Sequence, residues 1–315
     1  MRDAYLPKAL VLLLAMLPLS GCLLRSSHVV TSHLSTAMLK DATLEQLVEK
    51  INSQADRMQS FIANVDVDFS AGGQKKGKVT DYAELSGYIL MRKPELLRMF
   101  MQAPVVRSRV FDMASNGNTF EVSWPPKNQF FVGSSRLMGK PSDNPLENLR
   151  PQVITDALVL KHIDPEDEIA VLENGTEMVK DPKTHKTVEQ ATYVVTVIRR
   201  SQGQWALSRK ISFSRDTLLP HEQFIYDAKG QLVTYARYEN VSDHHGIMFP
   251  DIIDIQRPIE ELSFRLAVTK LRLNETIQDD QFILQQPPGS KLVDLDARSA
   301  SAAQTGQDPA KDPQY

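Results

Sequence analysis

Apolar residues recur along this chain with two different spacings, and the change from one spacing to the other marks its organisation. From Leu44 to Ile62 they return every three or four positions, which predicts one amphipathic helix. Thr43 can cap that helix, and Gln46 completes a capping box with it. The apolar stripe is expected to comprise Leu44, Leu47, Val48, Ile51, Ala55, Met58 and Ile62.

Beyond the helix the spacing falls to two residues, which is the period of strands with one buried face. Val65 to Phe69 shows this alternation, and similar segments continue to Leu273. Short turns join them: Asn116-Gly117 is a strong hairpin signal, Asn174-Gly175 is predicted to be a second turn, and Pro125 to Asn128 reverses the chain. Together these features predict about eleven strands in an antiparallel meander.

Three stretches depart from the strand pattern. Residues 139–160 hold three prolines among apolar residues, which predicts one or two short central helices. Asp164 to Glu168 is acidic but lacks the ligand spacing of a calcium loop, and it is interpreted as a solvated turn. The tail, residues 296–315, is rich in Ala, Ser, Gln, Asp and Pro and is expected to be disordered.

The N-terminal segment has the organisation of a bacterial export signal. Arg2 and Lys8 supply positive charge, and the 11 residues from Ala9 to Leu19 are apolar but far fewer than the roughly 20 that span a bilayer. The sequence Leu-Ser-Gly-Cys that ends at Cys22 resembles the bacterial lipobox. This resemblance implies that residues 1–21 are a lipoprotein signal peptide, that Cys22 carries the lipid, and that residues 22–42 form a tether.

An ordinary secretory signal followed by a buried cysteine is the alternative interpretation. Cys22 is the only cysteine among 315 residues, so it cannot form an intramolecular disulfide, and this favours lipidation. Two or three acyl chains would supply the more than one lipid signal that stable anchoring needs. In the lipoproteins that this segment resembles, Asp after the cysteine often retains the protein in the inner membrane. Leu23 occupies that position here and favours the outer membrane, with the inner membrane left open.

Composition and motifs argue against several classes of function. A net charge of −3 with 24% charged residues is unlike the concentrated basic surface of a nucleic-acid-binding protein. His244-His245 lacks a third ligand, so no metal site is expected. Gly133 to Pro141 has the wrong spacing for a phosphate-binding loop, and no nucleophile elbow is present. We therefore expect no cofactor and no enzymatic activity.

Two stretches have a distinctive order of strands, basic residues and prolines. Leu85 to Met99 is a glycine-led strand followed by two basic residues, a proline and a second apolar strand. Asp279 to Gly289 ends in Phe-Ile-Leu-Gln-Gln-Pro-Pro-Gly. Both stretches resemble segments of the bacterial lipoprotein carrier and receptor family, LolA and LolB, although Leu284 stands where the family has a second Phe. The resemblance extends over residues 43–295, which are expected to form one domain.

The resemblance implies a mainly β fold of the α+β type. Its strongly curved antiparallel sheet forms a half-open barrel, and the N-terminal helix and short central helices cover the mouth. The implied ligand is a lipid or the acyl chains of a lipoprotein. An incomplete barrel also leaves an apolar concave face that its own side chains need not fill.

Apolar residues of the predicted strands are the candidates for lining such a cavity, and methionines among them suit flexible chains. For each of them, ordinary core packing beneath the helices is the alternative. The candidates are Ile89, Met91, Leu97, Met99, Met101, Phe120, Val122, Trp124, Trp205, Leu207, Ile211, Phe213, Phe264 and Leu266.

Two further features are assigned from the resemblance. The family's carriers have an Arg before the proline that helps to hold the lid closed. Here Lys93 occupies that place and Arg92 precedes it, and because Lys lacks the planar fork of Arg, both residues are candidates for the lid contact. Val105 and Val106 correspond by position to the receptor's membrane-facing loop, with a buried turn as the alternative.

The sequence thus leads to a functional hypothesis. The protein would be a non-enzymatic, lipid-anchored protein of the outer membrane that faces the periplasm, binds lipid or lipoprotein acyl chains in an apolar cavity, and acts in lipoprotein or lipid sorting and transfer. Its partners would be the membrane, reached through the acylated Cys22, these acyl chains, and a periplasmic carrier or envelope protein. The alternative is an envelope sensor or structural lipoprotein on the same scaffold, with a cavity filled by its own side chains and a protein partner.

Overall fold

The computed structural model describes residues 33–34, 38–73, 77–135, 149–180, 185–201 and 203–297. The predicted signal peptide, Cys22, most of the predicted tether and nearly all of the predicted tail lie outside these residues. No helix among the described residues is both long and apolar enough to cross a membrane.

The chain divides into two compact units. The first combines Met1–Ser35 with Met178–Glu189, and the second combines Thr36–Glu177 with Gln190–Tyr315. In the first unit, the two-residue strand β1 (His33–Leu34) pairs in parallel with residues 188 and 189 at the start of β10. Both α-helices and the strands β2 to β16 belong to the second unit, apart from the last three residues of β9 and the first three of β10.

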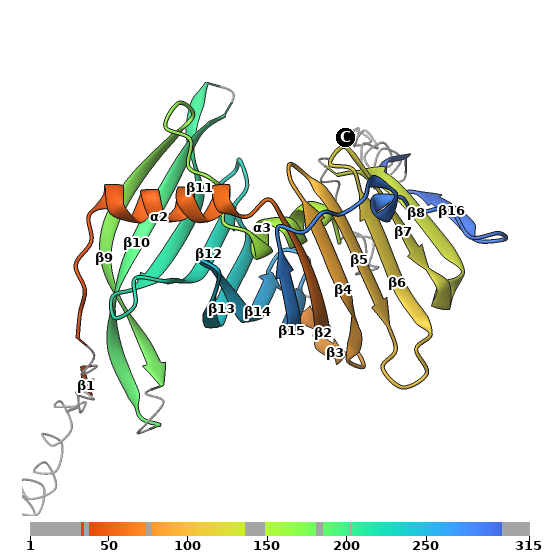
Figure 1. The fold of residues 1–315 in the computed structure, drawn as a ribbon, viewed down its shortest axis with the longest axis horizontal. Helices are drawn as coiled ribbons and strands as arrows, with labels where there is room; N and C mark the ends of the chain where they lie inside the picture. Colours follow the sequence, from red (N-terminus) through yellow and green to blue (C-terminus); the bar gives the residue numbers. More distant parts are fainter. Residues whose placement is uncertain are drawn as a thin grey trace, which may run out of the picture. The chain divides into compact units, whose positions relative to one another are not determined.

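One large sheet makes up most of the second unit (Figure 1). Its strands have the following bounds: β2 Ser60–Gly73, β3 Lys78–Asp81, β4 Leu85–Arg92, β5 Leu96–Gln102, β6 Arg109–Ser115, β7 Thr119–Trp124, β8 Gln129–Ser134, β9 Glu168–Lys180, β10 Thr187–Ser201, β11 Gln204–Ser214, β12 Pro220–Tyr226, β13 Leu232–His244, β14 Ile247–Arg257, β15 Leu262–Leu273 and β16 Lys291–Asp294.

Most neighbouring strands are consecutive in the chain, except where β2 lies between β15 and β4 and where β16 pairs in parallel with β8. The order runs β10-β11-β12-β13-β14-β15-β2-β4-β5-β6-β7-β8-β16, while β9 pairs with β10 and β3 with β2. The pairing of β15 with β2 therefore brings the two ends of the meander together in the middle of the sheet. The sheet stays open within the described residues because its outer strands do not pair with each other. The expectation of a mainly β, open and largely antiparallel architecture is confirmed.

The predicted number of strands was too low. The described residues form fifteen strands besides β1, in place of about eleven. All four residues of β3 are exposed, so this strand carries no alternating pattern. The predicted turn at Asn174-Gly175 was wrong as well, because both residues lie inside β9. A Cβ atom at Gly175 would lie 2.9 Å from Thr192 Oγ1, so glycine here permits a close approach to β10.

The predicted amphipathic helix is α2, Leu44–Arg57. The Gln46 N–H donates to Thr43 Oγ1 at 3.4 Å and the Thr43 N–H donates to Gln46 Oε1 at 2.9 Å, which confirms the capping box. Leu47, Ile51 and Ala55 are buried. The helix ends earlier than the apolar stripe suggested, because β2 begins at Ser60 and places Ile62 in that strand.

The central insert contributes a second helix, α3 (Pro151–Leu158), which has proline at its first position. This helix confirms part of the predicted insert, while residues 136–148 lie outside the described residues. Among the described residues, η1 (Pro125–Lys127) and η3 (Asp279–Phe282) are short 3-10 helices.

Alternation along the strands gives the sheet two faces. Both α2 and α3 pack on one of them, here named the helix face: α2 lies over β10 and β11 (Figure 1), and α3 packs against the core formed by β4 to β7. On the opposite face, the segment around η3 covers β4 to β8, where Phe282 packs near Leu90 and Leu284 packs near Phe130. The C-terminal stretch that resembles the LolA and LolB segment is thus a cover for the sheet.

Candidate functional site

A cavity of about 250 Å³ lies between α2 and the helix face of the sheet. Residues along one edge of the buried stripe of α2 form the first wall of this cavity. Residues 158–160, at the end of α3 and just after it, form the second wall. Strands β13 and β14 complete the enclosure. Apolar side chains dominate the lining, among them Ile51, Met58, Leu160, Phe213, Val241 and Phe249.

The volume of the cavity limits what it can hold. An apolar cavity of about 150 Å³ accommodates one benzene molecule and stays free of water, so this cavity has room for about ten carbon atoms. That is the size of one acyl-chain segment. Two or three acyl chains side by side exceed it.

Tyr238 shows how polar groups in the wall are satisfied. Its side chain is buried, and its hydroxyl donates to Ala157 O at 2.9 Å. Burial raises the pKa of this hydroxyl, and the nearby Asp156 carboxylate raises the pKa further. The tyrosine therefore stays neutral, and with its hydrogen bond directed into the protein it presents an apolar surface to the cavity.

Three polar side chains of α2 cross the mouth of the cavity. Lys50, Gln54 and Arg57 are spaced by four and three residues, so they form one edge of the helix. Each donates to a main-chain carbonyl: Lys50 Nζ to Leu218 O at 2.8 Å and Arg57 Nη1 to Gly246 O at 3.2 Å, both in turns between strands, and Gln54 Nε2 to Met248 O at 2.7 Å, at the start of β14.

The opposite edge of α2 is held more firmly. Asn52 exchanges two hydrogen bonds with the main chain of Ile163, at 2.8 Å and 3.1 Å. Lys93 Nζ donates to Ala55 O in the last turn of the helix, and burial lowers the pKa of this lysine. One edge of the helix is therefore attached by a pair of hydrogen bonds from the short Asn52 side chain, and the cavity edge by single hydrogen bonds from three longer, more flexible side chains.

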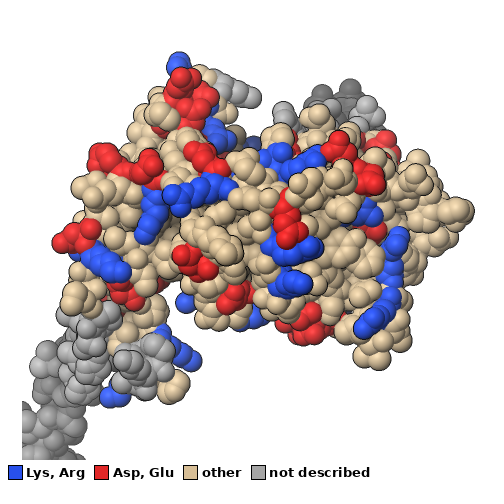
Figure 2. All heavy atoms as spheres, viewed as in Figure 1, with Lys and Arg blue, Asp and Glu red and all other residues tan. Residues whose placement is uncertain are grey.

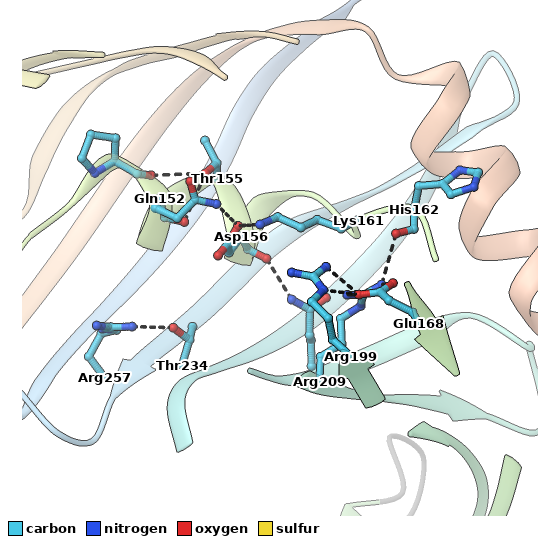
Figure 3. Close-up of polar contacts among 12 residues, drawn as sticks. Gln152, Thr155, Asp156, Lys161, His162, Glu168, Arg199, Arg209, Thr234 and Arg257 are labelled. Atoms are coloured by element: carbon cyan, nitrogen blue, oxygen red, sulfur yellow. Dashed lines mark hydrogen bonds and ion pairs between the residues drawn. The ribbon is translucent and has the colours of Figure 1, made fainter. Parts of the chain in front are cut away.

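A buried ion pair fixes the segment that forms the second wall (Figure 3). The Glu168 carboxylate accepts from Arg209 at 2.8 Å and 2.9 Å and from Arg199 Nε at 2.8 Å. Burial by itself would raise the pKa of Glu168, but the two guanidinium groups outweigh it and the pKa is lowered. The interpretation of this acidic stretch as a solvated turn was wrong for Glu168, whose side chain is 2% exposed.

Hydrogen bonds on both sides of residues 158–160 hold this second wall to the sheet. Arg209 Nη2 donates to His162 O at 3.2 Å, and Gln223 Nε2 donates to Asp156 O at 2.8 Å. Asp156 also pairs with Lys161 Nζ at 2.6 Å (Figure 3). Residues 158–160, which line the cavity, lie between these attachments.

Most of the predicted cavity residues lie on the helix face but pack as core. Phe213 lines the cavity beneath α2, and Ile211 packs in the core under the same helix. Met91 and Phe264 line two other hollows, of about 220 and 550 Å³. Trp124 is partly buried against the core. The remaining candidates fill the core beneath α3 or beside it: Ile89, Leu97, Met99, Met101, Phe120, Val122 and Leu266.

Trp205 and Leu207 do not share a face with Ile211 and Phe213, contrary to the expected alternation. Val197 opposes Arg209 but Ile198 opposes Leu207, so Ser208 is an extra residue in β11. This β-bulge reverses the alternation for the residues before it. Trp205 is accordingly 51% exposed, whereas Ile211 and Phe213 are fully buried.

The structure separates the two candidates for the lid contact. Lys93 reaches α2, as described above. Arg92 lies on the opposite face, where it donates to Ile277 O at 2.5 Å and pairs with Asp279. Val105 and Val106, proposed as the membrane-facing loop, are 90% and 74% exposed between β5 and β6, so this turn is not buried. Their contact with a membrane stays a prediction.

One group of side chains has the composition of a metal site. Ligand atoms of Glu177, His221 and Glu222 lie within 4.8 Å of one another among the described residues. His221 Nε2 donates to Glu177 at 2.9 Å, and Tyr235 donates to Glu222 at 2.5 Å, so each member already has a hydrogen-bond partner. His244, considered from the sequence, contacts Ser242 Oγ at 2.9 Å.

Sequence reasoning missed the polar edge of α2 and the wall after α3. The spacing of Lys50, Gln54 and Arg57 beside the apolar stripe was a usable signal, because residues at the border of a stripe lie where the core meets solvent. Tyr238 and Phe249 gave no comparable signal, since their strands alternate like the others.

No protein-family model matches this sequence, and no curated protein matches it either. Several solved structures are similar to it. A DUF1329 family protein from Desulfovibrio piger has a TM-score of 0.50 and 17% identity, over 75% of this chain and 94% of that protein. A LolA superfamily protein from Nitrosomonas europaea has a TM-score of 0.47 and 17% identity, over 78% and 99% of the two chains.

A protein domain named for outer membrane lipoprotein sorting, from Vibrio parahaemolyticus, has a TM-score of 0.47 and 11% identity, over 75% of this chain and 94% of that one. At identities this low the similarity concerns the fold. The open, mainly β sheet with few helices is an architecture that this chain shares with the DUF1329 family protein from Desulfovibrio piger.

Proposed function

We propose that this protein binds an acyl chain in the cavity beneath α2 and acts, without enzymatic activity, in the sorting or transfer of lipid or lipoprotein at the outer membrane. The observation that carries the proposal is the cavity itself. It has an apolar lining, room for about ten carbon atoms, and a helix attached by side chains along the edge of its mouth.

The attachment of α2 supports entry of a ligand. Opening the cavity edge breaks three single side-chain contacts with carbonyls that water can replace, whereas the opposite edge keeps the pair of hydrogen bonds between the Asn52 side chain and the main chain of Ile163. The helix can therefore turn about its Asn52 edge without unfolding. Such a movement would admit a flexible chain to the apolar interior.

A blocked cavity provides the direct test of acyl-chain binding. Val241→Phe places a ring in the cavity, and Val171→Phe makes the same change at a β9 residue that is 43% exposed and does not line it. Both are made in the full chain carrying Cys22→Ser, and binding of the neutral fluorophore 1-naphthylamine, whose ring system matches the size of the cavity, is titrated. We expect Val241→Phe to weaken binding about tenfold and Val171→Phe to leave it unchanged. Equal binding by both variants would contradict the proposal.

Anchoring through Cys22 is proposed from the lipobox resemblance. The acylated chain would place the protein on the periplasmic side of the outer membrane. Fractionation of cells that make the wild type or Cys22→Ser tests this. The wild type should sediment with outer membranes and the variant should be soluble, and a variant that sediments equally well would exclude a lipid anchor at this residue.

An envelope sensor or structural protein is the second candidate, and one observation favours it. Ile89, Met99 and Phe120 are buried in the core beneath α3, as expected where a face is filled by the protein's own side chains. Native mass spectrometry of the protein extracted from membranes separates the two candidates. A bound acyl compound supports the transfer role, while a bound envelope protein without lipid supports the sensor role.

A further inference from the structure

The mouth of the cavity carries two positive charges on one edge of α2. Lys50 and Arg57 both line the cavity and both reach across its mouth to turns between strands. Basic side chains gather along the position of α2 in the space-filling view (Figure 2). The two cations therefore lie at the border between an apolar interior and solvent.

Neither cation is neutralised by the contacts that the described residues make. Lys50 and Arg57 each donate to a neutral main-chain carbonyl, and neither forms an ion pair within the described part of the chain. The carboxylate on the same turn as Gly246 belongs to Asp243, which accepts from the Gly246 N–H at 2.6 Å. Burial lowers the pKa of Lys50, and the charge of Lys40 lowers it further, as expected for an ammonium group without a counter-charge.

The turn that Arg57 contacts is shaped to receive it. Gly246 has a φ of +85°, which favours glycine, and a Cβ atom there would lie 3.1 Å from Arg57 Nη1. The absence of a side chain thus lets the guanidinium group lie directly on the main chain at the mouth. Its other nitrogen atoms can still donate to a ligand, because the side chain is exposed.

These features define the chemistry of the ligand's polar end. We propose, on the basis of the proposed acyl-chain function, that the cavity takes a single-chain amphiphile whose headgroup is an anion, a carboxylate or a phosphate, and that Lys50 and Arg57 bind this headgroup at the mouth. Binding exchanges two contacts with neutral carbonyls for charge-assisted hydrogen bonds, which are shorter and stronger. The same exchange leaves Gln54 as the one polar contact of the three along the cavity edge of α2, so binding of the headgroup also favours opening of the cavity for the acyl chain.

The test compares ligands that differ only in their headgroup. Undecanoate, decyl phosphate, decanol and decyltrimethylammonium share a ten-carbon alkyl chain that matches the cavity. Each is titrated below its micelle concentration into the full chain carrying Cys22→Ser, by displacement of 1-naphthylamine. We expect both anions to bind about tenfold more tightly than decanol, and the cation to bind more weakly than decanol.

Two double variants locate the effect. Lys50→Gln with Arg57→Gln removes the charges at the mouth, and Lys229→Gln with Arg200→Gln removes one lysine and one arginine that are exposed elsewhere. The first pair should bind the anions as weakly as decanol while keeping wild-type affinity for decanol, which shows an intact cavity. The second pair should behave as the wild type.

The outcomes separate the headgroup inference from the function on which it rests. If decanol and both anions bind the wild type equally, or the mouth variant keeps its preference for anions, the headgroup inference is wrong and acyl-chain binding stands. If none of the four compounds binds, acyl-chain binding itself fails. Tighter binding of decyl phosphate than of undecanoate points to a phosphorylated lipid, and the reverse points to a fatty acid; both results support an anionic headgroup.

Discussion

Replacing Glu168 with Gln tests whether the buried ion pair holds the wall of the cavity in place. The Glu168 and Arg209 side chains are 2% and 4% exposed, and Arg209 donates two hydrogen bonds to the carboxylate. Glu168→Gln removes the negative charge but leaves Arg209 charged and buried. Breaking a buried pair in this way costs about 3–5 kcal/mol of unfolding free energy.

A solvent-exposed pair provides the control. The side chains of Arg272 and Glu275 pair at 2.9 Å and are 45% and 46% exposed. Glu275→Gln makes the same chemical change where water solvates both groups, and it should cost less than about 1 kcal/mol. The difference between the two variants therefore measures the effect of burial.

The pH dependence of stability gives an independent reading of the same pair. The pKa of Glu168 in the folded protein lies below its ordinary value of 4.5 because Arg209 and Arg199 outweigh the effect of burial. A lowered carboxyl pKa means that the stabilisation is complete above pH 4.5 and is lost as the pH falls through the folded value. The wild type should lose this contribution under acidic conditions, and Glu168→Gln should lack that part of the slope.

Urea unfolding followed by far-ultraviolet circular dichroism supplies the free energies, at neutral pH and through the acidic range. The double variant Glu168→Gln with Arg209→Met should recover part of the loss, because removing both partners leaves no uncompensated charge. A Glu168→Gln protein as stable as Glu275→Gln would refute the reasoning. So would a double variant that is no more stable than Glu168→Gln alone.

Two further predictions concern the sheet and its exposed turn. A Cβ atom at Gly87 would lie 1.8 Å from Phe100 O, so Gly87→Ala should lower the free energy of unfolding, measured in urea, by about 1–3 kcal/mol or more. Gly175→Ala is the control and should cost less, because its Cβ atom meets a side chain that can move. Equal losses in the two variants would contradict this prediction. The double variant Val105→Asp with Val106→Asp should co-sediment less with vesicles of phosphatidylethanolamine and phosphatidylglycerol. Because both side chains are exposed, its free energy of unfolding should change by less than about 0.5 kcal/mol. Undiminished co-sedimentation would exclude this turn as a membrane contact.

Local patterns in the sequence determined the elements that depend on neighbouring residues. Thr43 and Gln46 lie three positions apart and form the capping box they predicted. Asn116-Gly117 makes the hairpin turn between β6 and β7, with Gly117 at a φ of +90°. Alternation also placed most of the candidate apolar residues on the helix face. These features require only contacts between residues close in the chain.

Tertiary packing alone decided where the cavity lies and what surrounds it. Glu168 and Arg209 are 41 positions apart, and Lys50 and Leu218 are 168 positions apart, so neither contact leaves a local trace. One extra residue at Ser208 turned Trp205 outward, although the spacing of its strand looked regular. A periodic pattern records which face a side chain occupies, but the pairing of distant strands decides what it meets there. For this reason the sequence indicated an apolar face, and only the folded chain showed which part of it is filled and which part is hollow.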